Sequence, residues 1–512
     1  MPLQLPSRDP HPLAPGLYTT DAFHRQPLFA VNGQVVRSWN EAHSLHGPAR
    51  LEDVNPAYVA ALISSYRNAE VSSYKRVRRL PRSHHVHVRR DGNVQISAYD
   101  PLAGGASAME AEALHQFLQQ GLIDHVKEAL ESHAGAIGCE HSSGLDSNAV
   151  IGALVHGLDV EPERIHTWSR EEGGEGASLQ SCRTFHRLKP TQCHRFQPTD
   201  VGGKSSLDYF QQRLKVFGAP PQTGGSHKVV ALLGQQRCKV LFSGFGGDQA
   251  ISHNAGNVQT DLVAQGRWAE LTNWVGGKRQ SLKQIFGRSL LLRYRQLAEA
   301  MVLRRTSDFC STGLLIQTLT PKGRQWLEPY LNQPYPWELD GYILQHLSIR
   351  HRVLADWVAV RAEDETRLAA CYGMAKAFPL LDEKLIGTLL QQDPVLFSQG
   401  AGRGRLLHRR AFAPFLPPCL RDNPSKVREP EGGLEQWGSQ LINTHKKKLE
   451  NIALTISNWH PDLSIYWDVE EIRREVEDVV ASPKPTMKAV IGASQATTSM
   501  SELSGWWQSL DS

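Results

Sequence analysis

Short apolar runs alternate with helical patterns between residues 136 and 244, and this alternation constrains the fold more than any other feature of the 512-residue chain. Strands that alternate with helices are typical of βαβ units and a parallel sheet, whose ligands gather at the carboxyl ends of the strands. We therefore expect an α/β fold with a parallel sheet and helices on both faces. The predicted strands are 136–140, 164–169, 192–198 and 238–244, and the predicted helices are 147–158, 176–186, 206–218 and 227–236.

The flanking regions differ from this central part. Residues 1–105 contain two hairpin patterns with Gly-containing turns and predict a small β-rich region. Residues 108–133 have apolar side chains at helical spacing. Strand signals fade after about residue 255, so the C-terminal half is expected to be mainly helical. Residues 481–512 are small and polar apart from one aromatic pair, and predict a mobile tail.

The composition of the chain excludes few classes of protein or partner. The formal net charge of +4 gives no reason to expect a nucleic acid or a membrane as partner. Seven scattered cysteines indicate reduced thiols rather than a disulfide framework. Because no run of about 18 apolar residues and no leader pattern occurs, we expect a soluble, cytoplasmic protein.

Two Gly-containing loops follow predicted strands, and each carries one carboxylate. The first is "HSSGLDS", with Asp146, and the second is "FSGFGGD", with Asp248. The first loop lacks the lysine of a GxxxxGK[ST] loop, and by itself it favours an ordinary turn. Two such loops at the ends of strands in one sheet could hold Mg²⁺ between them, with ATP phosphates as further ligands. The pair therefore predicts a nucleotide site.

Several segments resemble the asparagine synthetase family. The first loop is similar to the family's SGGxDS pyrophosphate loop, and the second to its SGxGxD loop. The order and spacing match over residues 106–480. Further similar segments are "YGMAKAFPLLDEKLI" (the GxExRxPFLD segment), "GRGRLLHRRAFAPFLPPCLR" (K/R-x-x-LR-x-A…LP) and "DNPSKVREPEGG", which matches the loop of the catalytic lysine.

This resemblance implies an adenine nucleotide α-hydrolase-like sheet and a ligase that uses ATP and Mg²⁺. A carboxylate would attack the α-phosphate of ATP to give an acyl-adenylate and pyrophosphate, and an amine would then displace AMP. Lys426 would be the catalytic residue, and Asp146 and Asp248 would be the metal ligands. The residues implied to bind ATP and pyrophosphate are Ser142, Ser143, Gly144, Asp146, Ser147, Ser243, Gly244, Gly246 and Gly247.

The resemblance divides the chain into three parts. Residues 1–105 look like a degenerate amidotransferase region, because "LPRSHHVHV" and "AYDP" are similar to that domain's hairpin and ending. Residues 106–480 would form the synthetase domain, and 481–512 the tail. Glutamine-dependent members use a cysteine exposed by removal of the initiator methionine, but this chain has Pro2 and no cysteine before Cys139. The amine or ammonia is therefore not expected to come from a glutaminase of this chain.

Other departures leave the substrate open. Ser143 stands where the family has glycine. In β-lactam synthetase a tyrosine and a glutamate act together as the base toward the amine, and the matching positions here are Phe245 and Ala375. Lasso peptide cyclases share the degenerate N-terminal region, so a peptide macrolactam cyclase of natural-product biosynthesis is one alternative. A non-catalytic protein of the same fold is another. The expected partners are a small-molecule or peptide carboxylate and an amine, with a homodimer or a pathway protein left open.

Overall fold

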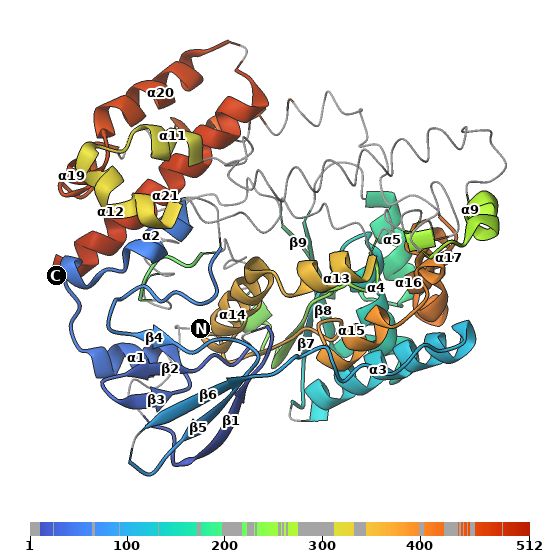
Figure 1. Ribbon diagram of the computed structural model, residues 1–512. Helices are drawn as coiled ribbons and strands as arrows, with labels where there is room; N and C mark the ends of the chain where they lie inside the picture. Colours follow the sequence, from blue (N-terminus) through green and yellow to red (C-terminus); the bar gives the residue numbers. More distant parts are fainter. Residues whose placement is uncertain are drawn as a thin grey trace.

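A computed structural model shows how these segments are arranged (Figure 1). It describes residues 11–196, 214–274, 312–331, 345–398, 404–423 and 439–511, with short gaps inside these ranges. The predicted helix 206–218 lies almost entirely outside the described residues, whereas residues 230 and 233–236 of the predicted helix 227–236 are described, and 230 and 233–235 are helical. Among the described residues, no helix is both long and apolar enough to cross a membrane.

The centre of the molecule is a five-stranded sheet in the order β11-β10-β7-β8-β9, and all of its pairings are parallel. This confirms the predicted parallel α/β sheet. The core strand β7 reads Ile-Gly-Cys-Glu and is buried at its first three residues, as expected for a strand covered on both faces. The strands are β7 (Ile137–Glu140), β8 (Ile165–Arg170), β9 (Cys193–Phe196), β10 (Val240–Phe242) and β11 (Ala375–Ala377).

Strand β11 was not predicted, because the sequence "AKA" has no strand-like periodicity. It pairs with β10 only over three residues, so its place in the sheet comes from tertiary contacts rather than from intrinsic propensity. The preceding helix α14 (Asp356–Ala370) packs against it and delivers it to the sheet edge. Strand β11, which lies in the mainly helical half, is thus the strand of the described sheet that the sequence did not predict.

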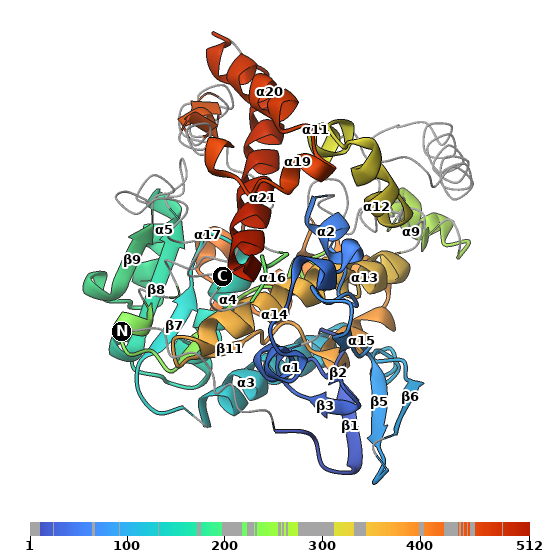
Figure 2. The same cartoon turned by 90° about the vertical axis from the view of Figure 1, so that its left-hand side faces the viewer.

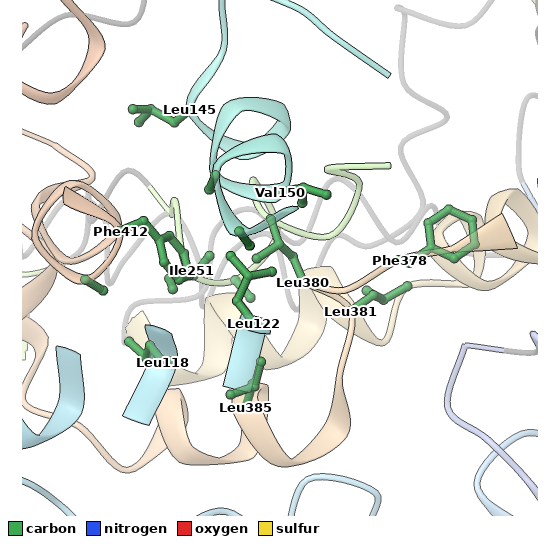
Figure 3. Close-up of a cluster of buried hydrophobic side chains, with 14 of the residues drawn as sticks. Leu118, Leu122, Leu145, Val150, Ile251, Phe378, Leu380, Leu381, Leu385 and Phe412 are labelled. Carbon is green, nitrogen blue, oxygen red and sulfur yellow. The ribbon is translucent and has the colours of Figure 1, made fainter. Parts of the chain in front are cut away.

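Helices pack around this sheet and create the largest hydrophobic core. Helix α3 (Ala111–Glu131) buries Leu114, Leu118, Leu122 and Val126, which recur every four residues on one face. Figure 3 shows part of this core: side chains of α3 and α4 meet Phe412 and the segment that precedes α15. The helices are α4 (Leu145–Gly152), α5 (Gly176–Phe185), α9 (Trp268–Trp274), α13 (Gln345–Val353), α15 (Glu383–Leu390), α16 (Leu406–Ala411) and α17 (Pro418–Arg421).

The N-terminal region forms two small antiparallel sheets, as the hairpin patterns predicted. They are β1-β5-β6 and β3-β2-β4, and both lie at the lower side of the molecule in Figure 1. Their elements are β1 (Gly16–Thr20), β2 (Phe29–Val31), β3 (Gln34–Val36), α1 (Trp39–His46), α2 (Pro56–Ile63), β4 (Arg78–Arg79), β5 (His84–Val88) and β6 (Val94–Ala98).

The C-terminal residues correct the expectation of a mobile tail. Residues Met487–Asp511 form the 25-residue helix α21, and Trp506 and Trp507 are buried in a second core that also contains residues of α2 (Figure 2). The composition misled because a few large apolar side chains, Val490, Met500 and Leu503 besides the tryptophans, are enough to bury one face of the helix. The other helices of this part are α11 (Thr312–Gln317), α12 (Pro321–Leu331), α19 (Leu463–Tyr466) and α20 (Val469–Ala481).

Candidate nucleotide and metal site

The first candidate loop connects β7 to α4, where a strand ends and a helix begins. Gly144 is the N-cap of α4 and supplies no side chain to the first turn. The loop is shaped by Asn148, whose Nδ2 donates to the carbonyl oxygens of Ser142 (2.8 Å) and Gly144 (2.7 Å). The Ser147 hydroxyl accepts from the backbone N–H of Ser142 at 3.2 Å. A rigid turn before an uncapped helix start is a suitable anion site, because the N–H groups of a helix start attract negative charge.

Two buried histidines fix the orientation of that Asn148 amide. His141 Nε2 lies 3.3 Å and His186 Nε2 3.1 Å from Asn148 Oδ1, an acceptor, so both rings present a protonated Nε2 to it. Burial lowers the pKa of His141 to about 4, and burial with the neighbouring histidines lowers the pKa of His186. Both rings are therefore neutral at physiological pH, and they support the loop from behind.

The second loop follows β10 and packs directly against the first. A Cβ atom on Gly244 would lie 2.6 Å from the backbone nitrogen of Ser147. A Cβ atom on Gly247 would lie 2.3 Å from the Cγ and Oδ1 atoms of Asp146. Gly246 has φ +100°, a conformation that residues with side chains rarely adopt. Three glycines of this loop are thus required by contact or by backbone geometry, which explains why the segment is rich in glycine.

The two predicted metal ligands come together at this junction. The Ser252 hydroxyl lies 3.2 Å from Asp146 Oδ2 and 3.2 Å from Asp248 Oδ1. Both carboxylates are therefore within hydrogen-bonding reach of one atom, although they are 102 residues apart in sequence (248 − 146). This is the arrangement expected of two loops at the ends of adjacent parallel strands.

Two basic side chains, one at the N-cap of α16 and one within this helix, face these carboxylates. Arg405 Nη2 lies 2.9 Å from Asp248 Oδ1, and His408 Nε2 lies 3.1 Å from Asp146 Oδ1 without an aligned hydrogen bond. Arg405 precedes the helix in a left-handed conformation (φ 65°, ψ 28°), which is costly for a non-glycine residue. Its Nε and Nη1 atoms are buried without a hydrogen-bond partner. A guanidinium with two unused donors is well suited to hold phosphate oxygens.

The residues present fit a divalent cation. Asp146 Oδ1 is buried and accepts no hydrogen bond, and Asp248 supplies a second carboxylate at the same junction. Carboxylate oxygens are the ligands that Mg²⁺ prefers, together with the phosphates of a substrate. Asp146 and Asp248 would hold the ion. No group of three or more His, Cys, Asp or Glu side chains among the described residues is placed to hold a metal, so phosphate oxygens or water would complete the coordination of such an ion.

A buried charged network lies beside the second loop. Lys376 Nζ pairs with Glu140 Oε1 at 2.6 Å and with Glu365 Oε2 at 2.9 Å. Ser243 Oγ donates to Glu140 Oε2 at 2.6 Å, which ties β10 to β7. Burial alone would lower the pKa of Lys376, but the two carboxylates raise it above its usual value. Lys376 is thus a permanent cation that anchors the strand ends.

The aromatic ring of Phe245 extends this network. The Arg361 guanidinium lies 4.1 Å from the ring centroid, and Arg361 Nε donates to Glu365 Oε1 at 2.7 Å. Trp357 and Phe378 pack edge-on against the same ring. The position that resembles a base-forming tyrosine is therefore an apolar, cation-stacked contact in this chain.

Most predicted site residues occupy the junction. Ser142, Ser143, Gly144, Asp146 and Ser147 lie in the first loop, and Ser243, Gly244, Gly246, Gly247 and Asp248 lie in the second. Lys426 lies outside the described residues. Sequence reasoning missed Asn148, His186 and Ser252. Asn148 and Ser252 could have been found from their positions one and four residues after motif residues, whereas nothing in the sequence indicates His186.

One comparison with known proteins identifies the family. A family model described as asparagine synthase matches residues 118–497, which is most of the chain and includes both loops. The match begins within α3 and ends within α21. The comparison with curated proteins gives no match.

Proposed function

Because the chain belongs to the asparagine synthase family, an ATP-dependent group of amide-forming ligases, we propose that it activates a carboxylate as an acyl-adenylate and transfers the acyl group to an amine. The products would be AMP, pyrophosphate and an amide. The carboxylate would belong to a small molecule or a peptide, and the amine or ammonia would not come from a glutaminase of this chain. We infer a cytoplasmic enzyme.

The convergence of Asp146 and Asp248 on the Ser252 hydroxyl is the observation that carries this proposal. According to this proposal, the first loop and the start of α4 bind the pyrophosphate part of ATP. A bound Mg²⁺ would neutralise the charge that develops on the departing pyrophosphate. Arg405 binds phosphate oxygens through the two guanidinium nitrogens that have no partner. Lys426 stabilises charge at the reacting centre, as the family resemblance implies.

The amine requires a base other than the tyrosine–glutamate pair. Phe245 has no proton to exchange, and Ala375 lies in β11 without a titratable group. The neighbouring Lys376 is bound between two carboxylates and stays protonated. We propose that the amine enters as the neutral species or that another residue accepts its proton, because none of these three residues can accept it.

We also propose that residues 1–105 form a covering region for the synthetase domain that follows, and that the boundaries lie near residues 105 and 480. Two ion pairs join this region to α14: Arg79 Nη2 with Glu363 Oε1 at 2.7 Å, and Arg82 Nη2 with Asp356 Oδ1 at 2.5 Å. Because α14 also carries Arg361 and Glu365, the N-terminal region supports the helix that contacts the second loop.

Trapping with hydroxylamine tests the proposal without knowledge of the amine. The full chain is incubated with ATP, Mg²⁺, hydroxylamine and a mixture of carboxylates, and hydroxamate, AMP and pyrophosphate are measured. We expect AMP and pyrophosphate in equal amounts with hydroxamate, and we expect Asp146→Asn and Asp248→Asn to abolish all three. Glu163→Gln, which changes an exposed carboxylate, is the matched control. ADP as the only product would refute adenylation.

A non-catalytic nucleotide-binding protein is a second candidate, and one observation favours it. Asp248 and Asp146 are faced by Arg405 and His408, so basic side chains already balance the carboxylates that would hold a metal. Such a protein would bind ATP equally well with and without Mg²⁺ and would form no hydroxamate. A peptide macrolactam cyclase would instead give a product that has lost one water molecule relative to its peptide substrate.

A further inference from the structure

A cavity of about 160 Å³ lies between α13, α15 and the chain that follows α15. Helices α13 and α15 lie side by side there (Figure 1). No residue of the first or the second loop lines this cavity. The lining residues are Asp261, Gln265, Gln345, His346, Ile349, Leu389, Leu390, Gln392, Pro394 and Phe397.

One residue that lines the cavity has polar groups that the protein leaves unsatisfied. The Gln345 side chain is buried, the residue being 2% exposed, and neither Oε1 nor Nε2 has a hydrogen-bond partner. Gln392, which also lines the cavity, differs: its Oε1 accepts from Met109 N and its Nε2 donates to the Thr388 carbonyl. An unpaired buried amide costs about 1–3 kcal/mol, so a protein keeps one where a ligand or an ordered water pairs with it.

Asp261 adds a buried carboxylate beside this amide. It is 3% exposed, and its Oδ2 accepts from the backbone N–H of Gln345 at 3.0 Å. Burial, opposed by the hydrogen bond from the Gln345 N–H and aided by the charge of Asp393, raises the pKa of Asp261 to about 6. Arg267 pairs with Asp393 at 2.7 Å and not with Asp261, so the carboxylate in the cavity has no cationic partner among the lining residues at hydrogen-bonding distance.

The cavity is also lined by apolar side chains. Ile349, Leu389 and Phe397 are among the side chains that line it, and all three are buried in the main core. A dry cavity of similar volume is large enough to hold a molecule with about six non-hydrogen atoms, such as benzene. A ligand of this size would need a short aliphatic part as well as polar groups at one end.

We propose that this cavity binds a small primary amine that carries a neighbouring carbonyl group. The ammonium pairs with the Asp261 carboxylate and donates a second hydrogen bond to Gln345 Oε1. The carbonyl accepts from Gln345 Nε2, and the aliphatic part contacts Ile349 and Phe397. This assignment concerns binding at a site apart from the phosphate loops, and it does not depend on whether the chain forms an amide.

Titration calorimetry and saturation-transfer NMR on the full chain test the proposal with three matched molecules. 2-Aminobutanamide has both polar groups, butanamide lacks the ammonium, and sec-butylamine lacks the carbonyl. We expect saturable binding of 2-aminobutanamide, and binding of each of the other two to be weaker by roughly tenfold, because each leaves one buried group unpaired. Equal binding of all three, or no saturable binding of 2-aminobutanamide, overturns the proposal whatever the variants do.

Two variants assign the groups. Asp261→Asn should remove the preference for 2-aminobutanamide over butanamide, and Gln345→Leu should remove its preference over sec-butylamine. Glu270→Gln, at an exposed carboxylate of α9 that pairs with Arg267, is the matched control and should change neither ratio. Because the readout is a ratio of affinities, a general loss of stability does not imitate it. Unchanged ratios in folded Asp261→Asn and Gln345→Leu would contradict the assignment.

Discussion

Gly247→Ala tests whether the second loop positions the carboxylate of Asp146. The new Cβ atom would lie 2.3 Å from Asp146 Oδ1, and ordinary contacts begin near 3.4 Å, so the carboxylate must move by 3.4 − 2.3 = 1.1 Å. Mg²⁺ demands near-ideal octahedral geometry with metal–oxygen distances of about 2.0–2.1 Å, so a carboxylate displaced this far can no longer coordinate the ion. We expect Mg²⁺-dependent ATP affinity to fall by about 10- to 100-fold, as for lost support of a metal ligand.

The stability of Gly247→Ala should fall as well. The clash also reaches Asp146 Cβ at 2.9 Å, an atom that side-chain rotation cannot move away, so the free energy of unfolding should drop by about 1–3 kcal/mol. ATP affinity is measured by calorimetry with and without Mg²⁺, and stability by urea unfolding. Gly104→Ala is the control, because a Cβ atom there meets nothing within 4 Å. Unchanged Mg²⁺-dependent affinity in folded Gly247→Ala would refute the reasoning.

Three further substitutions test other parts of the structure. Lys376→Met removes the cation between Glu140 and Glu365. It should lower the free energy of unfolding, measured by urea titration, by about 3–5 kcal/mol, because this is the cost of breaking a buried ion pair. A loss below about 1 kcal/mol would contradict the network. The pKa of His141 is lowered in the folded state, so its stabilising effect is complete above about pH 6.5 and is lost as the pH falls toward 4, by about 3 kcal/mol in total. His141→Gln should therefore be less sensitive to acid over that range, and an unchanged pH profile of unfolding would exclude this role. Gly492→Ala, in the middle of α21 with open space around its Cβ position, should raise the free energy of unfolding by about 0.5–1 kcal/mol, and destabilisation would show that the helix is misplaced.

Local patterns predicted the parts of the fold that local sequence determines. The strand before residue 141 and the strand before Ser243 are continuous apolar runs followed by glycine-containing loops, so their type and their shared sheet edge could be predicted. Strand β11 could not, because three residues without β-branched side chains acquire their pairing only from the helix that precedes them. Helix α21 was missed because its burial depends on partners from α2 and α11, distant in sequence.

The candidate site shows the same division. Asp146 and Asp248 were predicted because a carboxylate in each loop is visible in the sequence. Arg405 was only one of several arginines in its segment until its left-handed backbone placed it against Asp248. His186 supports the first loop from 38 residues further along the chain, a contact that no spacing rule indicates. The meeting of two loops at the ends of parallel strands is therefore predictable, whereas the contacts of single side chains such as Arg405 and His186 require the structure.

A double-mutant cycle on ATP binding tests the central claim, that both loops hold one metal–phosphate site. Mg²⁺-dependent ATP affinity is measured for the full chain, Asp146→Asn, Asp248→Asn and the double variant. If both carboxylates hold the same ion, each single substitution removes most of the Mg²⁺ dependence, and the second costs little after the first. Losses that add independently, or a Mg²⁺ dependence that survives in the double variant, would contradict the shared site.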